Sequence, residues 1–135
     1  MASGYSINPL SKKLGLKENY HVRLLNPPEN YNTLVDGWEN YLLDMGADAT
    51  NLDFIHFFTN SLEDLQNTLP VLMLQIKKSG IIWVSWYKKS AKKPTEISEN
   101  TIRDYALSIG LVDVKVCSID DDWSGLKLVY RLKDR

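Results

Sequence analysis

Residues 51–131 alternate between strand-like and helix-like segments, and this alternation constrains the fold more than any other feature of the chain. Four apolar runs have the composition of strands: 53–58, 81–86, 112–116 and 126–130. Two segments between them have helical periodicity: 61–78 and 98–109. Because a helix-like segment follows each of the first two runs, the order predicts an α/β domain with a largely parallel sheet. No helix separates the last two runs, which therefore predict an antiparallel hairpin.

The run at 81–86 is apolar at every position except Ser85, which is typical of a central parallel strand that is buried on both faces. Residues 112–116 and 126–130 instead alternate apolar and polar side chains, as strands nearer a sheet edge do. Earlier in the chain, 21–26 and 41–44 also predict strands. We therefore expect a sheet of about six strands with 81–86 at its centre.

Serine residues mark the start of both predicted helices. Ser61 and Ser98 can each cap a first turn, because the side-chain oxygen accepts a hydrogen bond from a free backbone N–H. Gly110 suits the left-handed residue that ends the second helix. Pro70 lies within the first helix and lacks a backbone donor, so we expect a kink or a break at that position.

Length and composition favour one domain. The chain has 135 residues, of which 44% are hydrophobic, and this is enough to bury one core. No linker rich in proline, glycine or serine divides it. Residues 1–135 are therefore predicted to form a single domain, with 1–19 as an N-terminal brace or short helix.

The net charge, the cysteine content and the lack of long apolar segments limit the binding partners and the cellular location that we expect. The 16 Lys and Arg residues against 17 Asp and Glu give a net charge of −1, so no overall field attracts the chain to nucleic acid or to an anionic membrane. Cys117 is the only cysteine, which excludes an intrachain disulfide. The first residues lack the features of a signal peptide, and the apolar runs are shorter than the roughly 20 residues that span a bilayer. These features predict a cytoplasmic protein without membrane contact.

No recognisable catalytic or metal-binding motif is present. The 7 glycines are never closer than about nine positions, which excludes a dinucleotide fingerprint and a phosphate-binding P-loop. His56 lies in an apolar run and is more typical of a hydrogen-bonded core histidine than of a catalytic base. The acidic run 120–122 lacks the spaced ligands of a calcium loop, and Asp44 is better explained as a turn residue than as a ribose ligand. We predict no catalytic residue, no metal and no cofactor.

The segment 85–94 combines aromatic rings with four lysines directly after the predicted central strand. In open α/β sheets, ligands bind beyond the carboxyl ends of the strands, and rings there could stack on a base while ammonium groups meet phosphate. The alternative, a solvated basic loop next to a buried tryptophan, is favoured because lysine runs are usually exposed. The candidate ligand-binding residues are Asn26, Ser85, Trp86, Lys88, Lys89 and Ser90.

Four segments resemble the second half of class I S-adenosylmethionine-dependent methyltransferases: 53–58, 77–84, 110–116 and 123–127. Residues 9–131 more closely resemble a family of small uncharacterised bacterial proteins with a shortened version of that fold. The motifs that carry this second resemblance are 12–17, 83–90, 98–103 and 111–117. Members often have proline where this chain has Tyr87. The resemblance implies a three-layer, Rossmann-like, mostly parallel sheet with a C-terminal antiparallel hairpin.

Methyltransferases of this class hold their cofactor on a glycine-rich turn after the first strand, where the backbone must approach the ligand closely. At that place this chain has Asn26, Pro27, Pro28 and Glu29. The departure favours a non-catalytic, methyltransferase-like binding or scaffold module over an enzyme. A divergent small-molecule methyltransferase is the first alternative, and a nucleotide- or RNA-associated protein that uses residues 85–93 is the second. The expected partner is a phosphate-bearing small ligand or another protein, with nucleic acid less favoured.

Overall fold

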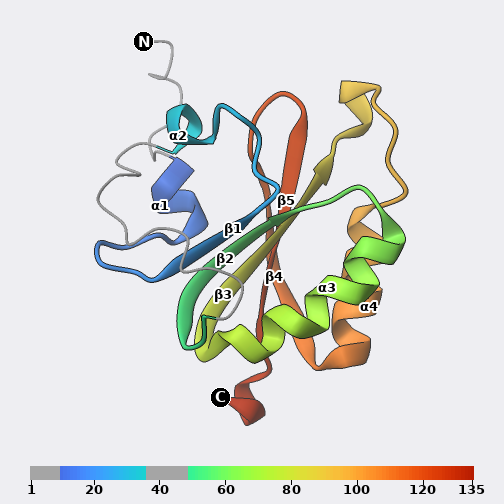
Figure 1. The fold of residues 1–135 in the computed structure, drawn as a ribbon. Coiled ribbons are helices and arrows are strands. Elements are labelled where there is room, and N and C mark those ends of the chain that lie inside the picture. The colour runs from blue at the N-terminus through green and yellow to red at the C-terminus, as the bar shows by residue number, and fades with distance from the viewer. Residues whose placement is uncertain (1–9, 36–48) are drawn as a thin grey trace.

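The structure is a computed structural model that describes residues 10–35 and 49–135. Its described part is a sheet with helices on both faces (Figure 1). Helices α3 (Leu62–Gln75) and α4 (Glu99–Ile109) cover one face, and the short helices α1 (Leu10–Leu14) and α2 (Tyr31–Leu34) lie on the other. This arrangement confirms the predicted three-layer α/β fold. The predicted strand at 41–44, with Asp44, lies outside the described residues.

Five strands form the sheet in the described part, in the order β1-β2-β3-β5-β4. Strands β1 (Val22–Leu25), β2 (Leu52–Phe58) and β3 (Ile76–Tyr87) are parallel to one another. Strand β5 (Trp123–Tyr130) runs antiparallel to both β3 and β4 (Leu111–Ser118). The mostly parallel sheet, the central position of β3 and the C-terminal hairpin all agree with the sequence prediction.

The two long helices begin where serines predict. The Oγ atoms of Ser61 and Ser98 accept hydrogen bonds from the backbone N–H groups of Asp64 and Thr101, at 3.1 and 3.2 Å. Gly110 ends α4 with a left-handed φ of 105°, and its N–H donates to the Ala106 carbonyl. Short 3₁₀ turns follow β3, at Lys89–Ala91, and β5, at Leu132–Asp134.

Helix α3 continues through Pro70 to Gln75, so of the predicted kink or break, the break does not occur. A proline inside a helix costs about 3 kcal/mol. Each fully buried leucine contributes about 1.5–3 kcal/mol, so the buried Leu65, Leu69 and Leu72 together outweigh that cost.

The same helix also ends before the predicted limit at residue 78. Ile76 has an extended backbone, with φ −85° and ψ 144°, and pairs with Leu52 of β2. Lys77 therefore belongs to β3, where its Nζ atom lies 2.8 Å from the Asp53 carboxylate. A buried β-branched residue that can join a strand overrides the weak helical preference of the two lysines that follow it.

Separate hydrophobic clusters fill the two faces of the sheet. Leu65, Leu69 and Ile102 pack against the face under α3 and α4. On the other face, the fully buried Trp83 of β3 donates a 2.8 Å hydrogen bond from Nε1 to the Leu14 carbonyl, which fixes α1 to the sheet. Within the described ranges, no helix has both the length and the apolar content needed to cross a bilayer.

Candidate functional site

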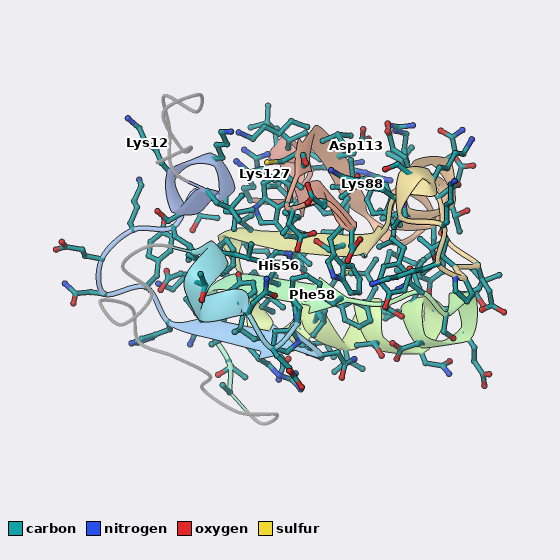
Figure 2. All side chains as sticks on the ribbon, turned by 90° about the horizontal axis from the view of Figure 1, so that it is seen from above. Lys12, His56, Phe58, Lys88, Asp113 and Lys127 are labelled. Carbon is teal, nitrogen blue, oxygen red and sulfur yellow. The ribbon has the colours of Figure 1, made fainter. Side chains whose placement is uncertain are left out.

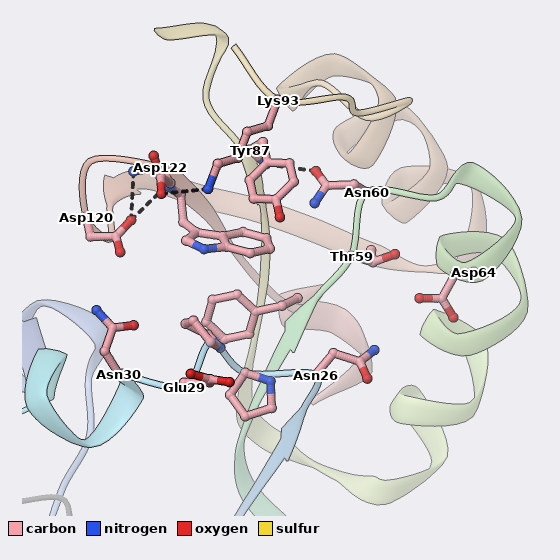
Figure 3. A pocket seen from close by; sticks show the side chains of 14 residues that line it. Asn26, Glu29, Asn30, Thr59, Asn60, Asp64, Tyr87, Lys93, Asp120 and Asp122 are labelled. Carbon is pink, nitrogen blue, oxygen red and sulfur yellow. Dashed lines mark hydrogen bonds and ion pairs between the residues drawn. The ribbon is translucent and has the colours of Figure 1, made fainter. Parts of the chain in front are cut away.

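The carboxyl ends of β1, β2 and β3 meet at a pocket of about 790 Å³, which we call the carboxyl-end pocket. Figure 3 shows Asn26 and Glu29 on one side of it and Tyr87 and Lys93 on the other. The β4–β5 turn also contributes side chains. The pocket is lined by Asn26, Pro27, Pro28, Glu29, Asn30, Phe58, Thr59, Asn60, Asp64, Tyr87, Lys93, Asp120, Asp122 and Trp123.

The loop after β1 forms one side of the pocket without glycine. Asn26 has a left-handed φ of 55°, a conformation that asparagine tolerates better than most residues. Pro27 and Pro28 follow and have no backbone N–H to offer a ligand. The next helix, α2, has only 4 residues, which is too short to present an ordered row of N–H groups to an anion. This loop therefore makes a wall rather than a cradle.

One side-chain and two backbone hydrogen bonds join the end of β2 to the end of β3 and to the loop after it. The Asn60 Oδ1 atom accepts from the Tyr87 N–H at 2.8 Å, and the Thr59 N–H donates to the Ser85 carbonyl at 3.0 Å. The Asn60 carbonyl also accepts from the Glu96 N–H at 2.9 Å. Asn60 therefore holds the loop after β3 in place. The sequence analysis missed this role, although an asparagine directly after a buried strand is a recognisable turn signal.

Three aromatic rings line the pocket. The Trp123 ring meets the Phe58 ring edge-on at 5.0 Å between centroids and lies 4.4 Å from the Tyr87 ring at a tilt of 39°. The Lys93 ammonium lies 5.2 Å from the centre of the Tyr87 ring. Because Phe58 is only 1% exposed, the half-buried Tyr87 and Trp123 rings are the ones that offer a planar ligand a surface for stacking.

The polar lining is mainly acidic. It contains four carboxylates, from Glu29, Asp64, Asp120 and Asp122, and a single ammonium, from Lys93. The hydrogen bond from Lys93 to the Asp122 carboxylate, at 3.0 Å, raises the pKa of Lys93 and keeps it charged. Because Asp122 already neutralises that ammonium, the remaining carboxylates repel an anionic ligand and favour a neutral or cationic one.

His56 lies beneath the pocket rather than in it. Figure 2 shows His56 and Phe58 inside the molecule beside α2, and their rings stack at 4.2 Å. His56 is fully buried, with Nδ1 at 2.8 Å from the Tyr31 hydroxyl and Nε2 at 2.7 Å from the Ser85 Oγ. Burial lowers the pKa of His56 to about 3, so the ring is neutral at pH 7. It joins α2, β2 and β3 as the hydrogen-bonded core histidine that the sequence predicts.

The structure does not bring the six predicted ligand-binding residues together. Asn26 lines the carboxyl-end pocket, whereas Ser85 is buried against His56. Trp86 is 7% exposed and packs into the hydrophobic cluster under α3 and α4. From the same segment, Tyr87, which was not among the predicted residues, reaches the pocket.

The predicted lysine loop points away from the pocket at most positions. The Lys88 Nζ atom donates to the Ser118 Oγ at 2.6 Å, and Lys89 and Ser90 lie in the exposed 3₁₀ turn after β3. Lys89 lines a second hollow of about 600 Å³, where Glu96 and Glu99 add negative charge. Lys93 is the lysine of this loop that reaches the carboxyl-end pocket.

Within the described ranges, no group of three or more His, Cys, Asp or Glu side chains could hold a metal ion. The acidic run forms the β4–β5 turn, where the Asp120 carboxylate accepts from the N–H groups of Asp122 and Trp123 at 2.9 and 2.8 Å. Burial raises the pKa of the Cys117 thiol, which disfavours the reactive thiolate.

Several solved structures, methyltransferases among them, share this architecture. An S-adenosylmethionine-dependent methyltransferase from Aquifex aeolicus is 17% identical with a TM-score of 0.63, over 88% of this chain and 86% of that chain. A TehB-like methyltransferase from Corynebacterium glutamicum is 10% identical with a TM-score of 0.59, over 96% and 91% of the two chains. Aeropyrum pernix fibrillarin, solved with natively bound S-adenosylmethionine, is 14% identical with a TM-score of 0.54, over 88% and 72%. At these identities the likeness shows the fold alone.

Sequence comparison gives the family. No curated protein matches the chain significantly. A family model described as a protein of unknown function, DUF3052, matches residues 30–132. This match spans most of the chain and agrees with the resemblance seen in the sequence. The chain therefore belongs to the DUF3052 family and has a methyltransferase-like, Rossmann-type α/β fold.

Proposed function

We propose that this protein is a methyltransferase-like binding module that holds a small ligand in the carboxyl-end pocket and does not catalyse a reaction there. The pocket itself is the observation that carries the proposal. It lies where open α/β sheets bind ligands, and its volume of about 790 Å³ suits a small molecule. Its aromatic rings and its acidic lining select a planar ligand that is neutral or positively charged.

The lack of catalysis is inferred from the groups that line the pocket. A general base at pH 7 needs a pKa near 7, but the pKa of Lys93 is raised and its ammonium is held by Asp122. The nearest histidine, His56, is fully buried and has both ring nitrogens engaged by Tyr31 and Ser85. Neither group can take a proton from a ligand in the pocket, so the four carboxylates of the lining are the bases left there, and no histidine or free amine is among them.

A divergent small-molecule methyltransferase is the second candidate, and the position of the pocket favours it. Its cofactor is cationic at sulfur, which the acidic lining would accept. Against it, the cofactor also carries a carboxylate, which would lie in a pocket where carboxylates outnumber ammonium groups and where Pro27 and Pro28 provide no N–H donors. The non-catalytic module is therefore the better-supported function.

A thermal-shift screen tests the proposal. Nucleosides and aromatic amines are each compared with a phosphorylated counterpart at constant ionic strength. We expect a nucleoside or an aromatic amine to raise the melting temperature, because a ligand at 100 times its Kd adds about 2.7 kcal/mol of stability. Tyr87→Leu, which removes a ring from the pocket, should weaken that stabilisation.

The matched control is Tyr105→Leu, which removes a half-buried ring from α4, away from the pocket. It should leave the ligand-induced shift unchanged. A screen in which no unphosphorylated compound stabilises the protein, or in which Tyr87→Leu retains the full shift, would refute binding in the carboxyl-end pocket.

A further inference from the structure

A further hollow lies at the opposite end of the sheet from the carboxyl-end pocket, where the parallel strands begin. It has a volume of about 390 Å³ and draws on segments that are far apart in the sequence. Figure 1 shows the C-terminal segment at the same end of the sheet as the start of β3. We call this site the basic hollow. Its cationic side chains are Lys17, Lys78, Lys127 and Arg135.

The lining of the basic hollow contains these four cationic side chains and no Asp or Glu side chain. The ion pairs found among the described residues use Lys77, Lys93 and Arg103 as their cations, and none of the four that line the hollow. A chain with a net charge of −1 thus places several cations around one small space without acidic partners. An anion is the ligand that such a lining favours.

The pairing of β4 with β5 places one more positive charge close to Lys127. Lys115 of β4 lies directly opposite Lys127 of β5 in the antiparallel register. Burial, and to a lesser degree the nearby Lys115, lower the pKa of Lys127, so its charged form is less stable than that of a solvated lysine. A bound anion would offset both effects.

Neutral donors complete the lining. Tyr20 and Ser79, whose side chains carry hydroxyl groups, also line the hollow. The Lys78 ammonium stands 4.0 Å over the ring of Tyr130, which is not a lining residue. Arg135 is held at this end by a 2.8 Å hydrogen bond from its Nε atom to the Tyr130 carbonyl. Ammonium, guanidinium and hydroxyl donors around one space match the several acceptor oxygens of a phosphate group.

We propose that the basic hollow binds a small phosphate-bearing molecule, such as a phosphomonoester or pyrophosphate. The four cationic residues line one hollow of about 390 Å³, which favours a small ligand over a nucleic-acid backbone. The site is separate from the carboxyl-end pocket, since the two share no lining residue. Its test does not depend on what the carboxyl-end pocket binds.

The experiment is an NMR titration of the ¹⁵N-labelled protein with pyrophosphate, with chloride adjusted to keep the ionic strength fixed. We expect saturable shifts of the amides of Lys17, Gly80 and Lys127. The Lys17→Gln/Lys127→Gln variant should bind about tenfold more weakly or worse, because it loses two charge-assisted contacts. The control Lys89→Gln/Lys92→Gln removes the same charge from the exposed loop after β3 and should bind as the wild type does.

Several results would overturn the proposal. They are the absence of saturable shifts in the wild type, an unchanged Kd in the Lys17→Gln/Lys127→Gln variant, and equal shifts with sulfate. Binding of a ten-nucleotide single strand at these amides without binding of pyrophosphate would instead assign the hollow to nucleic acid. If the half-buried Lys127 position does not tolerate glutamine, Lys17→Gln/Lys78→Gln replaces two exposed lysines and should show the same loss.

Discussion

The two ends of the sheet are built from the same strands but have opposite chemistry. At the carboxyl end, loops fixed by Asn60 and Asp120 surround a pocket with aromatic rings and an excess of carboxylates. At the amino end of the parallel strands, the start of β3, the end of β5 and the C-terminal segment surround a hollow lined by four cationic side chains and no Asp or Glu. The sheet determines where the two hollows form, whereas the side chains of the loops and strand ends determine which ligands each hollow binds.

The largest effect is expected from a substitution in β3, the strand that contributes to both the carboxyl-end pocket and the basic hollow. Trp83 is fully buried in β3, and Trp83→Ala should lower the free energy of unfolding by about 3–5 kcal/mol because it leaves a cavity in the sheet centre. Chemical denaturation of the two proteins measures the difference. The control is Leu74→Ala on α3, where the side chain is 80% exposed, and it should change stability by less than about 0.5 kcal/mol. An unchanged midpoint for Trp83→Ala would mean that β3 does not support both ends.

The next-largest effect is expected from His56, which joins α2 to β2 and β3 beneath the carboxyl-end pocket. Folding lowers the pKa of His56 to about 3, whereas in the unfolded chain the histidine has its ordinary pKa of 6.5, so between these values the unfolded state binds more protons. The contribution of His56 is therefore complete above pH 6.5 and is lost as the pH falls toward 3, at about 1.4 kcal/mol per pH unit.

Denaturation of the wild type and of His56→Gln at several values between pH 7 and pH 4 measures this contribution. Glutamine does not titrate, so the stability of the variant should fall less steeply with acid than that of the wild type. Parallel curves would show that His56 is not held neutral beneath the pocket.

The smallest effect is expected from removing the repulsion between Lys115 and Lys127 near the basic hollow. Lys115 faces Lys127 across β4 and β5, and Lys115→Gln removes this repulsion without touching the lining of the basic hollow. We expect a gain of a few tenths of a kcal/mol, within the roughly 0.2–1 kcal/mol of cross-strand pairs. The gain should appear at low ionic strength in thermal denaturation and shrink in 1 M salt. A loss of stability at low salt would contradict the crowding.

Much of the fold follows from local signals. Ser98 and Gly110 are recognisable from residue type and position, and they bound α4 as predicted. The exit of α3 into β3 at Ile76 was not predicted, because it depends on pairing with a strand residue 24 positions earlier, Leu52. Local propensity does not report a partner that is distant in the sequence.

The candidate sites were harder to predict than the fold. Asn26 takes the left-handed conformation for which the sequence analysis sought glycine, and asparagine is the residue that signals this alternative. The link from Tyr31 through His56 to Ser85 joins residues that are 25 and 29 positions apart. The basic hollow brings Lys17 next to Lys127, and no spacing rule relates positions that meet only through the sheet.

Calorimetry with S-adenosylmethionine tests most directly the claim that this methyltransferase-like sheet lacks the cradle for that cofactor. The account predicts no binding in the low micromolar range, because Pro27 and Pro28 replace the backbone donors that a cradle after β1 would supply. The same preparation should still give the saturable pyrophosphate shifts at the amino end, which shows that the protein is folded and competent. A dissociation constant for S-adenosylmethionine in the low micromolar range would contradict the account and favour a divergent methyltransferase.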